Sequence, residues 1–327
     1  MKRWTVIGLR LGVSGALIAW LLWVNRGSWD QLMEVSVWRL WPAALVFALS
    51  TLLGAWQWAL ILRRAGLPVG HGRMQSIYWV GLFFNNFLPG NVGGDLVKVS
   101  DVAVNTGQVA RTVAGTLLDR MLGLCALVFV AFAAGAVLGD RTPAGLPWWA
   151  LISLVLGVWV ASAILLSGRL GRMLLAVVTR LRRGRVSGRL KSLLGELQTW
   201  RADTRFVFRL AVLAFVVQAL RVTTHVLVSN AMDIPLDATR ILQLYVLVPV
   251  LGVAVVLPIS FNGLGVREFV ATRLMPDVGI GAESALAMQL VTYLVQVGVS
   301  LVGGVIFGVM LIQGRLRLRP PRGDRGN

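Results

Sequence analysis

The chain has 327 residues, of which 57% are hydrophobic and 14% charged, and its mean hydropathy is +0.75. Soluble domains are about 45–50% apolar and about 25% charged, so this composition excludes a soluble enzyme with one compact core and also a disordered chain. The net charge of +18 would suggest nucleic-acid binding in a soluble protein. In a membrane protein the cytoplasmic loops collect Lys and Arg, so the positions of the charges decide between the two interpretations.

Six segments are apolar over about the 20 residues that a helix needs to cross a bilayer. They are 5–24, 41–62, 121–139, 147–167, 207–228 and 285–312. The first is too long for the apolar region of a signal peptide and lacks a clear cleavage site, so we expect it to be retained as a span. Two further apolar runs, 75–88 and 241–259, are interrupted by Pro89 and Pro258. The sequence therefore predicts an all-α, polytopic membrane bundle.

The basic residues indicate which connections face the cytoplasm. Of the 32 Lys and Arg residues, 21 lie in the N-terminus, the 63–73 loop, the 168–206 segment and the C-terminal tail, with only three acidic residues. The connections 25–40, 140–146 and 229–240 together hold four basic and five acidic residues. The positive-inside rule places the first group, and with it both termini, in the cytoplasm. The excess of basic residues thus mainly determines how the protein is oriented in the membrane. Since no recognition module accompanies it, we expect no nucleic-acid partner.

This topology requires two re-entrant elements, because 74–120 must enter and leave from the cytoplasmic side and 241–283 from the outside. We predict one transmembrane domain, 1–313, in which two repeats of opposite topology are joined by a basic amphipathic segment. Their approximate bounds are 41–139 and 207–313 for the repeats, 168–206 for the segment, and 314–327 for a basic tail. Opposed repeats with broken helices are typical of transporters. Two independent kinks in ordinary spans are the alternative.

Both breaks are rich in glycine, which permits close backbone approach. A helix that starts after such a break presents free backbone N–H groups, and these form an anion site. A plain kink packed against another helix is the alternative. The candidate residues at the two breaks are Asn85, Asn86, Pro89, Gly93, Gly94, Pro258, Gly263 and Gly265.

Four charged residues lie beside the breaks: Asp95, Lys98, Arg267 and Glu268. A charge at the centre of a lipid-facing helix costs about 2.5–3.5 kcal/mol, so these side chains are expected to face an aqueous cavity or one another. Their signs predict two pairs across the repeat, Asp95 with Arg267 and Lys98 with Glu268. In the functional interpretation, Lys98 and Arg267 bind an anion while the acids orient them. Purely structural ion pairs are the alternative.

Polar residues also recur on one face of two predicted spans. They are Gln218, Arg221 and His225 in one span, and Gln289, Tyr293 and Gln296 in the other. These side chains either line a hydrophilic path or form hydrogen bonds between helices. Asp119 and Arg120 precede the span at 121, where they either anchor it at the interface or reach the mouth of the cavity. The single cysteine and two distant histidines have no metal-binding spacing, and we expect no metal or cofactor.

Three motifs resemble those of the lysylphosphatidylglycerol synthase transmembrane-region family, also called flippase-like domain proteins. Asn85–Asp95, NNFLPGNVGGD, resembles the N-x-x-P-G-x-x-G-G-[DE] element of that family. Leu118–Leu124, LDRMLGL, resembles its [DE]-R-x-x-G-L segment, and Pro258–Glu268, PISFNGLGVRE, resembles its P-x-S-x-x-G-x-G-x-R-E element. Their order and spacing match over nearly the whole chain.

The resemblance implies a multi-pass protein of a bacterial or archaeal inner membrane that flips an anionic phospholipid or a polyprenyl- or hopanoid-type intermediate. Its implied partners are membrane lipids and enzymes of lipid or glycan biosynthesis. The sequence ends at Asn327 without the soluble domain that uses aminoacyl-tRNA, so we expect no enzymatic activity. Lys98 stands where many members have Arg, and lysine binds phosphate as a point charge. A membrane-embedded lipid-modifying enzyme and a non-catalytic scaffold are the alternatives.

Overall fold

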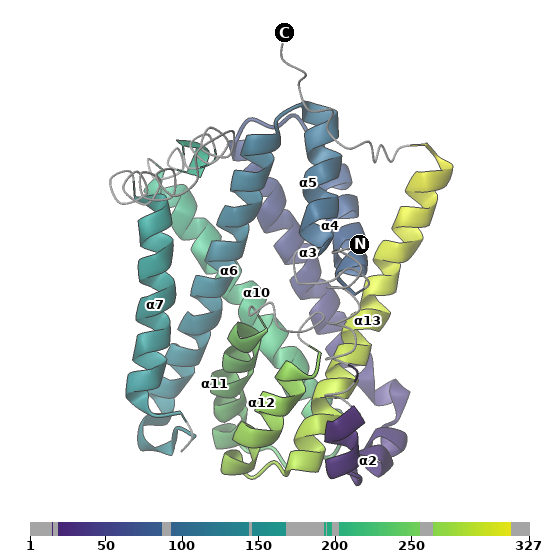
Figure 1. Cartoon of the computed structure of the whole chain (residues 1–327), viewed down its shortest axis with the longest axis vertical. Coiled ribbons are helices and arrows are strands. Elements are labelled where there is room, and N and C mark those ends of the chain that lie inside the picture. The colour runs from purple at the N-terminus through teal and green to yellow at the C-terminus, as the bar shows by residue number, and fades with distance from the viewer. Residues whose placement is uncertain are drawn as a thin grey trace, which may run out of the picture.

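The computed structural model of the chain describes residues 19–86, 93–143, 146–167, 203–255 and 264–314, together with residues 15, 193 and 195–197. This part of the chain contains helices and no strands (Figure 1). Four of its helices are long and apolar enough to cross a membrane. They are α3 (Trp41–Arg64), α6 (Val109–Leu138), α10 (Thr204–Ala231) and α13 (Ala282–Ile312). The prediction of an all-α, polytopic membrane protein is confirmed.

Shorter helices complete the bundle. They are α2 (Ser28–Glu34), η1 (Val37–Leu40), α4 (His71–Asn85), α5 (Gly93–Thr106), η2 (Gly139–Arg141), α7 (Trp148–Leu166), α11 (Ala238–Ala254), α12 (Val266–Leu274) and η4 (Met275–Val278). In Figure 1, α7 lies at one edge of the bundle beside α6, α13 lies at the other edge, and α10 crosses diagonally between them.

Three predicted spans, 41–62, 207–228 and 285–312, coincide with α3, α10 and α13. The fourth, 147–167, is the apolar helix α7. The start predicted at 121 is wrong, because α6 begins at Val109 and carries Asp119 and Arg120 in its interior. Hydropathy placed the start of this span after its last charged residue, although a helix continues through charges that face a cavity. The span 5–24, the basic segment 168–206 and the tail fall mostly or wholly outside the described residues.

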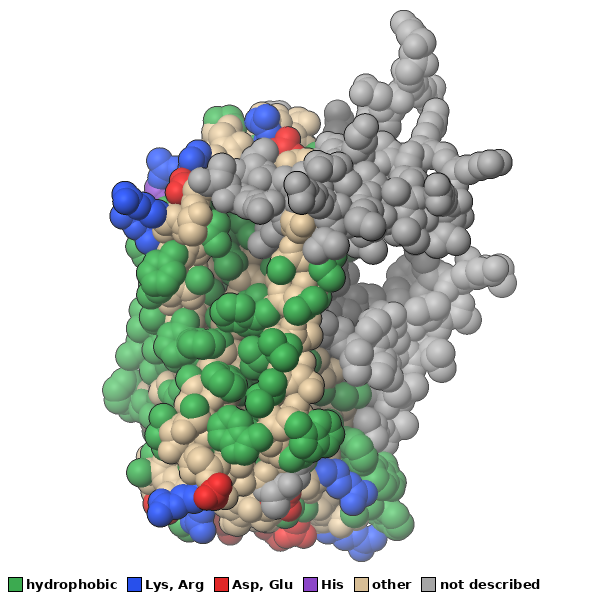
Figure 2. All heavy atoms as spheres, turned by 90° about the vertical axis from the view of Figure 1, so that its left-hand side faces the viewer, with side chains coloured by type: hydrophobic (Ala, Val, Ile, Leu, Met, Phe, Trp, Pro, Cys, Tyr) green, Lys and Arg blue, Asp and Glu red, His purple; other side chains and the backbone are tan. Residues whose placement is uncertain are grey.

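The outer surface of the bundle is apolar between two polar ends. Figure 2 shows a face on which hydrophobic side chains form a broad band, while Lys, Arg, Asp and Glu side chains gather at its two ends. Many large apolar side chains are exposed in the helices, including Val137 at 72%, Leu294 at 62% and Val305 at 68%. Such a continuous exposed apolar surface would be unfavourable in water, and it is what a bilayer requires.

The α3–α10 pair runs antiparallel through the centre of the bundle and is fastened at both ends. Arg39, before α3, forms an ion pair of 2.6 Å with Asp233, after α10. At the opposite end, Arg64 lies 3.0 Å from Asp203, which also caps α10 by accepting the backbone N–H of Phe206. These hydrogen bonds from Arg39 and Arg64 lower the pKa values of Asp233 and Asp203, respectively.

The two short helix pairs lie in opposite halves of the bundle: α4 and α5 in the upper half of Figure 1, and α11 and α12 in the lower half. At 1.5 Å per residue α4 is about 22 Å long, less than the roughly 30 Å of a hydrocarbon core. The connections 87–92 and 256–263 lie outside the described residues. The re-entrant hairpins and the inverted repeat therefore stay predictions.

Glycines allow α4 to pack closely against two neighbours. A methyl group on Gly94 of α5 would overlap the carbonyl oxygen of Gly81 in α4, and one on Gly303 of α13 would overlap the carbonyl oxygen of Trp79. Phe84 of α4 and Phe307 of α13 meet edge to face, with ring centroids 5.0 Å apart. Close contact at glycine is a common way for helices to associate in membranes.

We expect Gly303→Ala to destabilise the protein by about 1–3 kcal/mol, because the backbones of α4 and α13 must separate to admit the methyl group. Gly298, on the same helix, has no atom within 4 Å of the position of an added Cβ. Gly298→Ala should be neutral or stabilise the helix by up to about 1 kcal/mol. Thermal unfolding of the two variants in the same detergent measures the difference, and equal melting temperatures would contradict the packing described.

Candidate functional site

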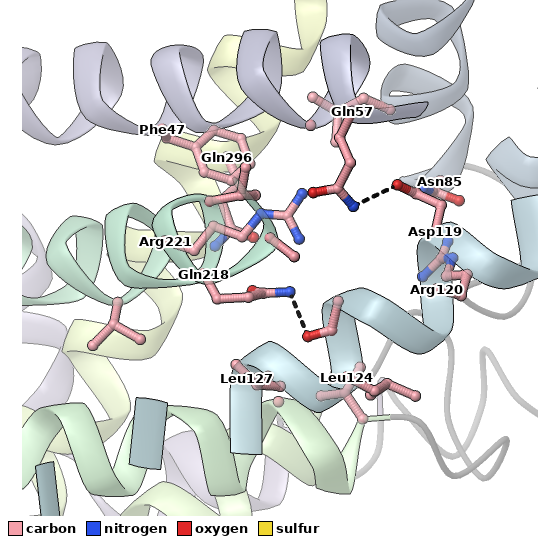
Figure 3. Close-up of a pocket in the computed structure, with 18 of the residues that line it drawn as sticks. Phe47, Gln57, Asn85, Asp119, Arg120, Leu124, Leu127, Gln218, Arg221 and Gln296 are labelled. Carbon is pink, nitrogen blue, oxygen red and sulfur yellow. Dashed lines mark hydrogen bonds between the residues drawn. The ribbon is translucent and has the colours of Figure 1, made fainter. Parts of the chain in front are cut away.

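A cavity of about 350 Å³ lies among the middle turns of α3, α6 and α10 (Figure 3). Its walls come from both halves of the chain: α3 to α6 from the first half and α10 to α13 from the second. Apolar side chains such as Phe47 and Leu127 form part of the wall. The four cations in the wall are Lys98, Arg120, Arg221 and Arg267. Cations at this depth in a membrane protein are costly unless water or an anion reaches them.

Asp95, in the first turn of α5, holds two of these cations. Its carboxylate lies 2.7 Å from Nζ of Lys98 and 2.6 Å from Nε of Arg120. The Lys98 ammonium also lies over the rings of Tyr78 and Trp58, at 4.4 and 5.2 Å from their centroids. Asp95 and Lys98 are buried, whereas 43% of the Arg120 side chain is exposed. A buried carboxylate thus positions one shielded and one accessible cation at the cavity wall.

Two asparagines lie at the end of α4, and both line the cavity. Asn85 Oδ1 accepts a hydrogen bond of 2.7 Å from the backbone N–H of Gly94 and so satisfies one of the free amides at the start of α5. Asn86 Nδ2 donates to Ser300 Oγ at 2.7 Å and ties α4 to α13. The predicted anion site at the start of α5 is therefore partly occupied by the protein's own amide oxygen.

Glu268 is the third residue of α12, as Asp95 is the third residue of α5. The helix follows Gly265, whose φ of +87° lies in the left-handed region that glycine tolerates. The fully buried carboxylate of Glu268 accepts hydrogen bonds from Gly265 N–H at 2.6 Å and from Arg267 Nη2 at 2.8 Å. Arg267 also donates to the carbonyl oxygen of Gln289 at 3.2 Å and lies 5.7 Å from the ring centroid of Tyr293. Arg267 thus lines the cavity, and Glu268 and the Gln289 carbonyl group fix its orientation there.

The predicted pairs across the repeat, Asp95 with Arg267 and Lys98 with Glu268, are wrong. Asp95 instead pairs with Lys98 one helical turn away, and Glu268 pairs with its neighbour Arg267. Asp95 and Lys98 are three residues apart and so are neighbours on one helix face, and Arg267 folds back onto the adjacent Glu268. Each acid thus neutralises a cation of its own helix without the two halves having to meet. The halves contribute separate charge clusters to one cavity.

Gln218, Arg221 and His225 of α10 all line the cavity, as their shared helix face predicts. Gln218 Nε2 donates to the carbonyl oxygen of Gly123 on α6 at 3.0 Å. Figure 3 shows Arg221 extending from α10 toward Gln57 of α3. Arg221 forms no ion pair with a described residue, and its buried Nε has no hydrogen-bond partner among them. It is the cavity cation that a ligand can engage without displacing a carboxylate.

Sequence reasoning missed two polar residues of the wall, Gln57 and Tyr78, and left the place of a third, Asp119, open between the interface and the cavity. Gln57 Nε2 donates to Asp119 Oδ1 at 2.8 Å. Gln57 and Tyr78 are isolated polar residues in apolar helices and belong to no motif. Of the two places considered for Asp119, the interface and the cavity, the structure has the cavity. A lone glutamine inside span 41–62 is itself a usable signal, because a buried amide there needs a partner.

The remaining predicted site residues fall into three groups. Those that line the cavity besides the α10 residues are Asn85, Asn86, Lys98, Arg120, Arg267 and Gln296. Those that are buried or lie at helix starts without lining it are Gly93, Gly94, Asp95, Gly265, Glu268 and Gln289. Those outside the described residues are Pro89, Pro258 and Gly263. In the described part of the chain, no three His, Cys, Asp or Glu side chains are grouped so that they could hold a metal ion.

Comparisons with known proteins agree with the motifs. The model of the family described as lysylphosphatidylglycerol synthase TM region matches residues 7–304. A UPF0104 membrane protein of Pyrococcus horikoshii is 29% identical over 134 residues, and this match covers 39% of the chain and only 38% of the relative. No solved structure matches the chain. Because the family model covers nearly its whole length, the chain belongs to the lysylphosphatidylglycerol synthase transmembrane-region family.

Proposed function

We propose that the protein moves an anionic lipid between the two leaflets of the membrane, either a phospholipid or a polyprenyl- or hopanoid-type intermediate. The observation that carries this proposal is the cavity within the bundle, lined by four cations and by several side-chain amides. A charged headgroup loses its hydration when it enters a bilayer, so a protein that moves it must replace the lost interactions along the path. Acyl chains need no such replacement and can stay in the surrounding lipid.

The positions of the short helices support an alternating path. In Figure 1, α4 and α11 lie in opposite halves of the bundle, and both end at the cavity, where Asn86 and Val255 line the wall. We take them as parts of two hairpins that enter from opposite surfaces. Rocking of one repeat against the other then opens the site to each leaflet in turn. The basic connections support a topology in which both termini lie in the cytoplasm of a bacterial or archaeal cell.

We expect Arg221→Gln to reduce lipid flipping by about ten-fold or more, because a hydrogen bond to a charged group contributes about 1.5–3 kcal/mol. The measurement uses proteoliposomes with a fluorescent anionic phospholipid and follows its bleaching by a membrane-impermeant reductant. Arg209→Gln is the matched control, since Arg209 is an exposed arginine three turns earlier on the same helix.

Equal loss of flipping in the Arg209 and Arg221 variants would assign the effect to overall charge rather than to the cavity. Folded wild-type protein that flips neither phospholipids nor polyprenyl phosphates would count against transport altogether. A lipid product that disappears from cells while the leaflet distribution stays unchanged would point to an enzyme instead.

Asp95→Asn should destabilise the protein by about 3 kcal/mol, because it leaves the buried Lys98 ammonium and the Arg120 guanidinium without their carboxylate. Asp233→Asn removes an exposed ion pair and should have little effect, because water already solvates both partners. Thermal unfolding in detergent compares the two variants. Similar stability of both would show that Asp95 does not hold the two cations in place.

A further inference from the structure

Resting on the proposed function, we infer the class of headgroup that the cavity carries: one phosphodiester charge with free hydroxyl groups. Headgroups to which a cation has been added, such as aminoacyl esters, are disfavoured. The inference depends on two independent observations: the balance of charges around the cavity, and the polar atoms that lack a partner inside it.

The charges around the cavity leave at least one positive charge in excess. Four cations line it, and three carboxylates oppose them: Asp95 and Glu268 behind the wall, and Asp119 in the wall. Lys98, Arg120 and Arg267 each pair with a carboxylate, whereas Arg221 forms no ion pair with a described residue, so the excess charge is at Arg221.

The acidic residues in the rest of the chain do not remove this excess. The undescribed connections 87–92 and 256–263 contain no charged residue in the sequence. Of the 14 acidic residues, Asp324 in the tail alone lies outside the described part of the chain. An anionic headgroup such as a phosphodiester therefore reduces this excess, whereas a headgroup with a net positive charge adds to it.

The atoms without partners require both an acceptor and a donor from the ligand. Gln57 is only 4% exposed, and while its Nε2 donates to Asp119, its buried Oε1 has no partner among the described residues. The buried Nε of Arg221 likewise has no acceptor there. Figure 3 shows the two side chains pointing toward one another across the cavity. Leaving such atoms unpaired is costly, so a fitting ligand satisfies both.

A phosphodiester oxygen accepts from Arg221, but a phosphodiester at neutral pH has no proton to donate to Gln57. The donor must come from the rest of the headgroup, as a hydroxyl or an ammonium. An ammonium would enter a site that already has an excess positive charge at Arg221, and like charges repel strongly where water is scarce. A hydroxyl donates to Gln57 and Asp119 without that repulsion.

The test measures binding of short-chain lipids to the purified, full-length protein in a neutral detergent. Phosphatidylglycerol offers one charge and two hydroxyls, phosphatidylmethanol offers the same charge and no hydroxyl, and lysyl-phosphatidylglycerol adds cations. We expect phosphatidylglycerol to bind about ten-fold more tightly than either of the others, because phosphatidylmethanol leaves a buried polar group unpaired and the lysyl ester adds cations beside Arg221. This order is measured on the wild type and does not depend on the folding of a variant.

Gln57→Met removes the free acceptor and nearly preserves side-chain length. It should abolish the preference for phosphatidylglycerol over phosphatidylmethanol while phosphatidylmethanol still binds. Gln75→Met is the matched control, because Gln75 also has a buried, unpaired Oε1 but does not line the cavity. The control should retain the ten-fold preference, and its loss in both variants would overturn the role of Gln57.

Equal binding of phosphatidylglycerol and phosphatidylmethanol by the wild type, or tighter binding of the lysyl ester, would overturn the inference. Glycerophosphoglycerol, which has the same headgroup without acyl chains, identifies the source of the ligand: binding as tight as that of the lipid would overturn a lipid ligand. Flipping is measured separately in vesicles. Protein that binds with the expected preference but flips none of these lipids would support the headgroup class and contradict the proposed function.

Discussion

The cost of placing charge inside an apolar bundle is the constraint on which the rest of this structure depends. A cation within a membrane span must be paired, reach water or bind an anion, because the hydrocarbon offers none of these. Lys98, Arg120 and Arg267 meet the requirement through buried carboxylates on α5 and α12. Arg221 has no carboxylate among the described residues and faces the cavity instead. The bundle is therefore organised around a polar interior that its apolar surface would not suggest.

Holding such a cavity open while the helices stay packed requires different kinds of contact in different places. Around α4 the helices approach through Gly81, Gly94 and Gly303, where a methyl group would force the backbones apart. Along α3 and α10 the contact is fastened at the two polar ends by the ion pairs of Arg39 and Arg64. The middle of the α3–α10 pair is thereby free to carry Gln57 and Arg221 into the cavity.

Much of the site could be predicted from the sequence because its residues are chemically conspicuous where they stand. Lys98, Arg221 and Arg267 are charges in or beside apolar segments, and each lines the cavity. The partners of Lys98 and Arg267 were predicted incorrectly, because opposite signs in two distant segments indicate attraction but not distance. Asp95 and Glu268 had nearer cations on their own helices, and at low dielectric the electrostatic attraction to the nearer cation is stronger.

The sequence by itself determined the membrane class, the long helices, most of the charged residues at the site and the family, because each of these follows from local composition or from short motifs. Only the tertiary structure decided that α6 starts at Val109, that Gln57 meets Asp119, and that Arg221 alone among the cavity cations has no carboxylate partner in the described part of the chain. These depend on how helices far apart in the chain cross, and contacts between helices leave no period or motif in either helix alone. The free cation, on which the function proposed here depends, is a property of the packed bundle.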